Sequence, residues 1–305
     1  MTQKNRISVC IVSFSGDAHA NIVAAILKKR HGACVKIIHP ENCQDTVSLS
    51  YGVKSKGEKI IYDVTWVRRK NFLYLTPGGT TDLDLKINVA QSNQDALDTF
   101  ITRSSHRLVN PIEKAARIEN KATQLGFAES SGLKAPSTLI SSSYTKIMEF
   151  ESEHGPLVIK SMRSIGGAPT GTFLFDAKHM SPEACSWSHA IYQEKISGSK
   201  HLRVAVFGSK ILPFLYESNH LDSRFDARSG AILIDIPESL SNGILRFMDI
   251  SGLRMGVFDF KQSDAGEWYF LEVNQQGAFA YLDPLSGYPI LLDFAKFIAD
   301  EASIR

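Results

Sequence analysis

A segment near the carboxyl end of the chain, residues 257–274, has the alternation of a β-hairpin that carries acidic residues. It reads V-F-D-F-K-Q-S-D-A-G-E-W-Y-F-L-E-V-N, in which D-A-G is a turn and both flanks are rich in β-formers. Pairing across the turn at 264–267 sets three pairs of residues opposite each other: Phe260 and Leu271, Asp259 and Glu272, and Phe258 and Val273. Directly opposed residues share a face of the hairpin. The two acids therefore share one face, which Asn274 joins two residues later.

The shared face of Asp259, Glu272 and Asn274 predicts a metal site. Two carboxylates held opposite each other repel, and a fold gains nothing from that arrangement unless a cation or a shared proton lies between them. Two carboxylates and an amide oxygen suit Mg²⁺ or Mn²⁺, which keep coordination positions for water and phosphate oxygens. The alternative is an exposed amphipathic hairpin with solvated acids, one of which Lys261 neutralises.

Composition and charge are those of a soluble enzyme. The 305 residues are enough for two or three domains, and the hydrophobic fraction of 43% is ample for their cores. The 34 Lys and Arg nearly balance the 32 Asp and Glu, so we expect no nucleic-acid partner and no attraction to a membrane. The chain starts without a cleavable apolar segment, and no apolar run is long enough to span a bilayer. The cytoplasm is therefore the expected compartment.

The order of predicted elements indicates an α/β fold class. Apolar runs predict strands, and helical spacing of apolar residues predicts the helices between them. The strands are expected at 7–14, 34–38, about 59–69, 155–160, 190–196 and 202–215, the last being two strands with a turn at Gly208 and Ser209 between them. The helices are expected at 18–30, 88–104 and, as one long helix, 111–131. We place a domain boundary near residue 105.

Three further features of the middle of the chain suggest anion binding. Gly166 and Gly167 lie in a Gly-rich segment whose backbone amides can approach phosphate, although a plain hairpin turn is the more frequent cause of such a segment. Lys160 ends an apolar strand, where a charge needs a partner. Arg203 lies inside another apolar strand and is expected to meet phosphate or a carboxylate, with a structural ion pair as the alternative.

Several short segments occur along the chain in a characteristic order. They are G-D-A-H (16–19), W-V-R-R (66–69), E-N-K ending at Lys121, the strand lysine Lys160, Q-E-K-I (193–196), L-R-V (202–204), D-A-R (226–228), D-F … F-L-E-V-N (259–274) and G-Y-P-I (287–290). This order resembles the ATP-grasp ligases and, among them, is most similar to the graspetide synthetases, the microviridin-type peptide macrocyclases. The resemblance covers nearly the whole chain.

The resemblance implies an ATP-grasp fold made of three parts. These are an N-terminal α/β (pre-ATP-grasp) domain at 1–105, a central domain with the first nucleotide lysines and the Gly-rich loop at 106–190, and a C-terminal ATP-grasp domain with the metal site at 191–305. The implied nucleotide-binding set is Lys121, Lys160, Gly166, Gly167, Gln193, Glu194, Lys195, Ile196 and Arg203. In it the lysines neutralise phosphates, and the backbone of 194–196 holds adenine. Asp259, Glu272 and Asn274 hold magnesium ions that bridge phosphates.

The chemistry that the resemblance implies begins when a substrate carboxylate attacks the γ-phosphate of ATP and forms an acyl phosphate. A Thr or Ser hydroxyl, or a Lys amine, of the same precursor peptide then attacks, and a lactone or lactam ring closes on its Glu or Asp side chain. The implied catalytic residues are Arg203, Arg228, which faces the peptide carboxylate, and Asp226, which orients Arg228 or helps to deprotonate the nucleophile. A plain surface pair of Asp226 and Arg228 is the alternative. The family also implies a leader segment on the precursor and a homodimer.

Two other functions remain open from the sequence. One is an ATP-grasp ligase that joins a free amino acid or a small peptide to an acceptor, and the other is a nucleotide-binding peptide carrier without catalysis. The chain also departs from the family pattern E-x-N-P-x-G-Q-W, because it reads E-V-N-Q-Q-G-A-F at 272–279. Gln275 replaces Pro and Phe279 replaces Trp. Metal ligation is expected to survive, while the local rim of the substrate site is expected to differ.

Overall fold

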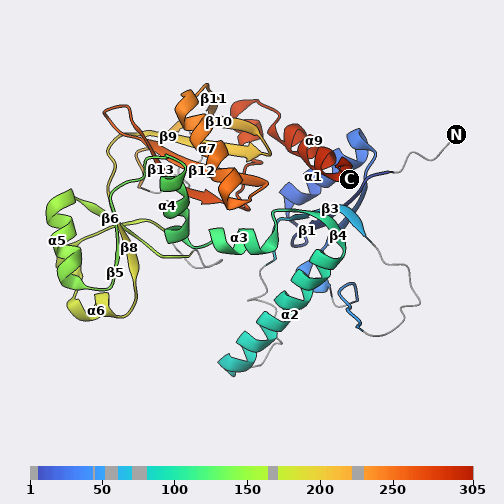
Figure 1. The fold of residues 1–305 in the computed structure, drawn as a ribbon, viewed down its shortest axis with the longest axis horizontal. Coiled ribbons are helices and arrows are strands. Elements are labelled where there is room, and N and C mark those ends of the chain that lie inside the picture. Colours follow the sequence, from blue (N-terminus) through green and yellow to red (C-terminus); the bar gives the residue numbers. More distant parts are fainter. Residues whose placement is uncertain are drawn as a thin grey trace. The chain divides into compact units, whose positions relative to one another are not determined.

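The computed structural model of the protein describes residues 6–43, 45–51, 61–70, 81–163, 171–221 and 230–304. It forms two compact units, and the chain leaves the first unit and returns to it (Figure 1). The first unit comprises Met1–Glu113 and Pro289–Arg305, and the second comprises Lys114–Tyr288. Helices and strands alternate as expected for the α/β class. The three-domain division stays a prediction.

The first unit is built on a parallel four-stranded sheet in the order β2-β1-β3-β4. Its strands are β1 (Ser8–Val12), β2 (Cys34–Ile38), β3 (Tyr62–Val67) and β4 (Ser105–Val109). Its helices are α1 (Ala18–His31), the short 3₁₀ helix η1 (Pro40–Asn42), α2 (Leu83–Arg103) and α9 (Ile290–Ser303), and α3 (Ile112–Ile118) follows β4. Helices pack on both faces, so β1 and β3 are largely buried on both sides.

The two faces of this sheet have separate cores. One core joins Cys10 and Val12 of β1 to Leu97 and Ile101 of α2. On the other face α9 packs against α1 and β3, and Trp66 is 1% exposed, with its ring centroid 4.7 Å from that of Phe294. Trp66 is therefore a packed strand aromatic.

The G-D-A-H and W-V-R-R segments meet at the carboxyl ends of β1 and β3. Asp17 caps α1 by accepting from the backbone N–H groups of His19 and Ala20, and it also accepts from the hydroxyl of Ser13 at 2.6 Å. The Nε of Arg68 lies 3.6 Å from the same carboxylate. Burial, together with the charge of Arg68, lowers the pKa of His19 to about 3. This cluster is accounted for by capping and ion pairing.

The second unit contains an antiparallel five-stranded sheet in the order β11-β10-β9-β12-β13. Its strands are β9 (Lys200–Phe207), β10 (Lys210–Glu217), β11 (Ile232–Leu233), β12 (Met255–Gln262) and β13 (Trp268–Asn274). Two helices, α4 (Lys121–Ser130) and α7 (Glu238–Ser251), cover one face, where Phe247 packs among Phe258, Phe260 and Phe270. The polar residues of β9, β12 and β13 consequently lie on the other face.

A second antiparallel sheet of the same unit has four strands in the order β5-β8-β6-β7. These are β5 (Thr138–Ser141), β6 (Leu157–Lys160), β7 (Phe173–Leu174) and β8 (Ala190–Glu194). Its helices are α5 (Tyr144–His154), the 3₁₀ helix η2 (Ala177–His179) and α6 (Pro182–Ser186), while α8 (Leu282–Ser286) follows the hairpin of the larger sheet. Ile147 and Tyr192 are central to its core.

The single helix expected at 111–131 is wrong, because the structure has two helices there. α3 ends at Ile118 and α4 begins at Lys121. Asn120 between them adopts an extended conformation, and its side chain accepts from the backbone N–H of Ala122 at 3.0 Å. An asparagine that caps a helix in this way starts a new one. The apolar periodicity continues across the break, which is why the sequence pattern did not reveal it.

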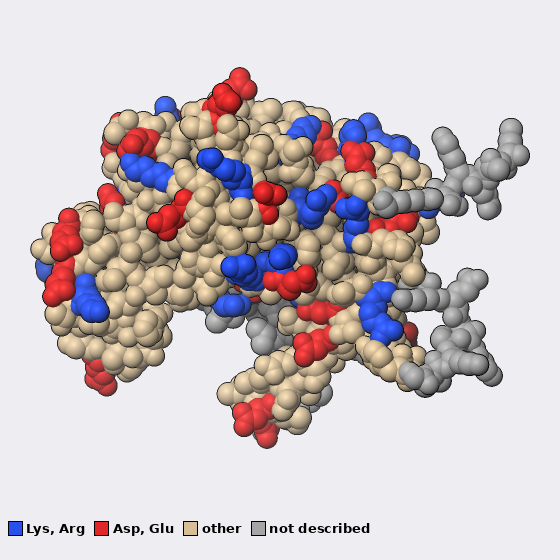
Figure 2. All heavy atoms as spheres, viewed as in Figure 1, with Lys and Arg blue, Asp and Glu red and all other residues tan. Residues whose placement is uncertain are grey.

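Charged side chains of both signs are interspersed on the face seen in Figure 2, in agreement with the near balance of charges in the sequence. No helix within the described ranges is long and apolar enough to cross a membrane.

Candidate functional site

The β12–β13 hairpin confirms the predicted pairing of the two acids and corrects one of the predicted apolar pairs. Asp259 lies opposite Glu272, and Phe258 lies opposite Val273, as predicted. Phe260, however, pairs with Phe270 and not with Leu271, because a β-bulge follows Asp259. The turn is also one residue wider than expected, since the N–H of Ser263 donates to the carbonyl of Glu267. The bulge restores the pairing of the acids despite the different turn.

Asp259 pairs with Arg203, which lies directly opposite it on β9. Nη1 of Arg203 donates to both carboxylate oxygens, at 2.7 and 3.0 Å, and Nη2 donates to the carbonyl of Ala278 at 2.8 Å. The arginine side chain is 7% exposed. Burial disfavours its charged form, but the Asp259 carboxylate outweighs that effect and raises the pKa of Arg203 above its ordinary value. Arg203 thus has a carboxylate partner, which fits both the predicted contact with a carboxylate and the alternative of a structural ion pair.

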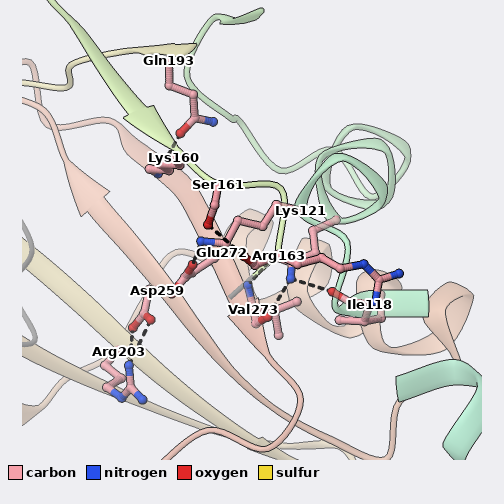
Figure 3. A network of polar contacts seen from close by, with 11 residues as sticks. Ile118, Lys121, Lys160, Ser161, Arg163, Gln193, Arg203, Asp259, Glu272 and Val273 are labelled. Carbon is pink, nitrogen blue, oxygen red and sulfur yellow. Dashed lines mark hydrogen bonds and ion pairs between the residues drawn. The ribbon is translucent and has the colours of Figure 1, made fainter. Parts of the chain in front are cut away.

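Glu272 pairs with Lys121, the first residue of α4, whose Nζ lies 2.9 Å from Oε2 of Glu272. The capping by Asn120 fixes where this helix starts, and the backbone N–H of Lys121 donates to the carbonyl of Met162. Each acid of the hairpin therefore meets a cation that the hairpin does not supply. Figure 3 shows Arg203, Asp259, Glu272 and Lys121 in this succession.

Lys160 ends β6 and has the partner that its apolar strand required. Its Nζ donates to Oε1 of Gln193 on β8 at 2.8 Å, as seen in Figure 3. Nε2 of Gln193 in turn donates to the hydroxyl of Thr138 at 2.9 Å, and that hydroxyl donates to the carbonyl of Pro136. Gln193 is 2% exposed. A fixed chain of hydrogen bonds across three strands thus holds the amine of Lys160.

Two backbone N–H groups of the segment that follows Gln193 already form hydrogen bonds within the fold. The N–H of Glu194 donates to Ser137 and that of Lys195 donates to Pro156, at 3.0 and 2.9 Å. Ile196 is buried, while the side chain of Lys195 is exposed. A ligand at this segment would therefore use neither of these two N–H groups.

The end of β13 leads into a tight turn. Oδ1 of Asn274 accepts from the N–H of Gln276 at 3.0 Å, and the carbonyl of Asn274 accepts from the N–H of Gly277 at 3.1 Å. Gln275 is buried, and Phe279, which stands where the family has Trp, is fully buried with its ring 5.0 Å from that of Phe207. Both departures from the family pattern thus lie inside the unit.

Replacing Gly277 by Ala is expected to lower the free energy of unfolding by about 1–3 kcal/mol, because the added methyl overpacks the turn. A Cβ at this position would lie 2.5 Å from Cβ of Val257, which cannot rotate away. Urea titration measures the loss. Gly126→Ala in α4 is the matched control, since nothing lies within 4 Å of its added Cβ, and helix propensity there favours Ala. Equal stability of the two variants would contradict the prediction.

The donor set of the hairpin fits a hard divalent cation. Asp259, Glu272 and Asn274 lie on one face and provide two carboxylates and an amide oxygen. An amide oxygen has two lone pairs, so the bond to Gln276 leaves one for a metal. Within the described ranges there is no cluster of three or more His, Cys, Asp and Glu that could hold a metal ion, so the amide of Asn274 is needed to complete the set.

Four of the predicted site residues lie outside the residues that the structure describes. They are Gly166, Gly167, Asp226 and Arg228. The structure brings Lys121, Arg203, Asp259 and Glu272 together by direct contacts, and Lys160 joins Gln193. Sequence reasoning missed Thr138 and Gln124, neither of which stands out by pattern, since their contacts are made across the fold.

The polar face of one antiparallel sheet carries two cation–acid pairs, and the second sheet of the same unit carries Lys160, which is held by a glutamine. The chain has the ATP-grasp fold, with structural matches that span nearly its whole length. Neither a protein-family model nor a curated protein sequence matches it.

Several of the solved structures that match are ATP-grasp ligases or macrocyclases bound to a peptide. The macrocyclase MdnC from Microcystis aeruginosa, bound with precursor peptide MdnA, is 22% identical, with a TM-score of 0.82 over 96% of this chain and 100% of MdnC. A RiPP-associated ATP-grasp ligase from Chryseobacterium gregarium, in complex with ADP and a leader and core peptide, is 20% identical, with a TM-score of 0.81 over 97% of each chain. PsnB, complexed with minimal precursor, Mg and ADP, is 17% identical, with a TM-score of 0.79 over 97% of this chain and 98% of PsnB.

Proposed function

We propose that this protein is an ATP-dependent ligase that closes ester or amide macrocycles in a ribosomally made precursor peptide. The observation that carries the proposal is the pairing of each hairpin acid with a cation from another element, Asp259 with Arg203 and Glu272 with Lys121. It occurs on a fold whose solved members include ligases bound to precursor peptides, ADP and Mg. These four residues can exchange the ion pairs that they make with one another for contacts with a nucleotide and its metal.

The nucleotide would lie along Lys160, Lys121 and Arg203. Lys160 is held by Gln193 with its amine fixed, so it can neutralise phosphate without ordering a flexible side chain at the moment of binding. Lys121 would move from Glu272 to phosphate. The segment from Glu194 to Ile196 would hold adenine, and Gly166 and Gly167 would contribute backbone amides to the phosphates.

Asp259, Glu272 and Asn274 would hold Mg²⁺, with Mn²⁺ as an alternative of similar ligand preference. The metal supplies neutralisation of the phosphate oxygens when bound. The residues of the chain would contribute by holding the γ-phosphate of the nucleotide and the carboxylate of the peptide in position for the reaction. Arg203, anchored on the carbonyl of Ala278, keeps its position when Asp259 turns to the metal.

The reaction would proceed in two steps. A carboxylate oxygen of a Glu or Asp side chain of the peptide attacks the γ-phosphorus, the bond to the β,γ-bridging oxygen breaks, and ADP leaves. A Thr or Ser hydroxyl or a Lys amine of the same peptide then attacks the acyl carbon, loses its proton, and expels phosphate. Arg228 would face the peptide carboxylate as a bidentate donor, and Asp226 would orient it. A homodimer and a cytoplasmic location complete the proposal.

The test is the intact mass of a candidate precursor after incubation with the protein, ATP and Mg²⁺. A Thr- and Glu-rich peptide encoded beside this protein is the candidate. Each ring removes one water from its mass. Addition of an amino acid would favour the ligase that joins free amino acids to an acceptor, and nucleotide binding without ATP consumption would favour the carrier.

Replacing Lys160 by Ala is expected to raise KM for ATP and to lower kcat, since the amine would contact phosphate in both ground and transition states. Loss of a charge-assisted hydrogen bond costs about 1.5–3 kcal/mol, or roughly 10- to 150-fold in kcat/KM. Steady-state kinetics with ATP varied measures the change. Lys146→Ala, at an exposed lysine of α5, is the control. If the Lys160 variant had the same KM and kcat as this control, Lys160 would have a structural role only.

A further inference from the structure

Gln124 makes a set of contacts that its position on α4 does not require. Its side chain is buried, and Nε2 donates to the carbonyls of Ile118 and Val273, at 2.7 and 3.0 Å. Oε1 accepts from the backbone N–H of Val273 at 2.9 Å. Every one of these partners is a backbone group, and two of them belong to one residue of β13. The amide therefore pairs with Val273 in the way that a neighbouring strand would.

β13 needs such a partner because it is the edge strand of its sheet. Among the described strands none pairs with its outer side, where the N–H and C=O groups of alternate residues point away from β12. The backbone N–H of Phe270 donates to the carbonyl of Lys134, and Val273 is paired by Gln124. A buried side-chain amide supplies one donor and one acceptor in the geometry of a peptide group, which apolar residues of the same size cannot do.

The residue that Gln124 holds lies between two proposed metal ligands, Glu272 and Asn274. Lys121, one turn earlier on the same helix, contacts the side chain of Glu272. The first turn of α4 thus meets the strand twice, at the carboxylate through Lys121 and at the adjoining peptide groups through Gln124. The lysine contact is lost when Lys121 turns to phosphate, whereas the amide contact need not change.

We propose that Gln124 is a positioning residue of the metal site, which fixes the backbone of β13 so that Glu272 and Asn274 present their oxygens together. The inference rests on the proposed function. Gln124 touches neither metal nor nucleotide and acts through Val273. Groups that orient metal ligands typically alter metal affinity by about 10- to 100-fold when they are removed.

The test is the affinity of the full-length protein for Mn²⁺ at saturating ADP, measured by electron paramagnetic resonance of free Mn²⁺. Gln124→Met keeps the size of the side chain but removes its donors and its acceptor. We expect its Mn²⁺ affinity to fall about 10- to 100-fold, while its affinity for ADP without metal stays within about twofold of wild type. A merely structural role would lower both or neither.

The matched control is Phe127→Leu. Phe127 lies one turn further along α4, and its ring packs against Phe247 of α7 at 5.7 Å, so this variant loosens the packing of the same helix and leaves the hydrogen bonds between Gln124 and Val273 in place. Its Mn²⁺ affinity is expected to equal that of wild type. If Gln124→Met does not fold, Gln124→Ala replaces it, because the smaller side chain leaves room for a water that satisfies Val273 without fixing it to α4.

The outcomes distinguish a failure of the positioning role of Gln124 from a failure of the proposed function. A folded Gln124 variant that binds Mn²⁺ as wild type does would overturn the positioning role and leave the proposed function intact. A fall in Phe127→Leu equal to that in the Gln124 variant would overturn it as well, since the effect would then be one of helix stability. Wild-type protein that binds no Mn²⁺ with ADP would overturn the metal site and the proposed function together.

Discussion

Replacing Glu272 by Gln is expected to lower ATP-dependent turnover by roughly 10²- to 10³-fold, the magnitude seen when a charge-stabilising group of an active site is removed. The change keeps the shape of the side chain but takes away a carboxylate of the proposed metal site. The amine of Lys121, 2.9 Å from Glu272, would also lose the partner that positions it. Release of ADP in the presence of precursor peptide measures the loss.

Glu267→Gln is the control for this experiment. Glu267 is an exposed residue of the same hairpin and lies directly before the start of β13. Its Oε2 lies 2.6 Å from Nζ of Lys134. It lies outside the proposed site, so its turnover should stay within about twofold of wild type, as expected for an exposed ion pair. Wild-type turnover of Glu272→Gln at millimolar Mg²⁺ would remove Glu272 from the metal site.

The second large effect is on stability. Asp259→Asn is expected to lower the free energy of unfolding by about 3–5 kcal/mol, because it leaves the guanidinium of Arg203 buried without its charged partner. From the sequence alone the opposite is expected, since removing one of two facing acids relieves repulsion. The structure reverses that expectation, because Arg203 donates to both oxygens of Asp259. Denaturant unfolding monitored by fluorescence measures the change.

Asp264→Asn, in the exposed turn of the same hairpin, is the matched control and should change stability by no more than about 0.5 kcal/mol. The double variant Asp259→Asn with Arg203→Met removes both charges and should recover part of the loss. If the single variant Asp259→Asn proved as stable as wild type, the ion pair would not contribute to the fold.

The hairpin shows which structural features can be predicted from the sequence alone and which cannot. Alternation places Asp259 and Glu272 on one face whatever the local details, because the apolar residues between them must enter the core. The bulge could not be foreseen, since Phe270 and Leu271 are both apolar and either can face Phe260 by pattern. What selects Phe270 is the aromatic cluster with Phe247 of α7, which comes from a distant part of the chain.

The partners of the acids illustrate a different limit. Arg203 could be flagged as a charge inside an apolar strand, but its pairing with Asp259 depends on β9 lying next to β12. Lys121 was linked to the site by resemblance, although the break between α3 and α4 that places it at a helix start was missed. Gln124 carries no pattern at all, because an amide that pairs with a strand edge has no preferred spacing in sequence.

The return of the chain to its first unit bears on how the protein is made. Trp66 of β3 is packed by Phe294 of α9, so the part of this sheet face that α9 covers stays open until residues 290–303 have left the ribosome. The second unit, Lys114–Tyr288, is continuous in sequence and has its own cores, so it can complete its folding earlier. During synthesis the unit that begins first is thus finished last.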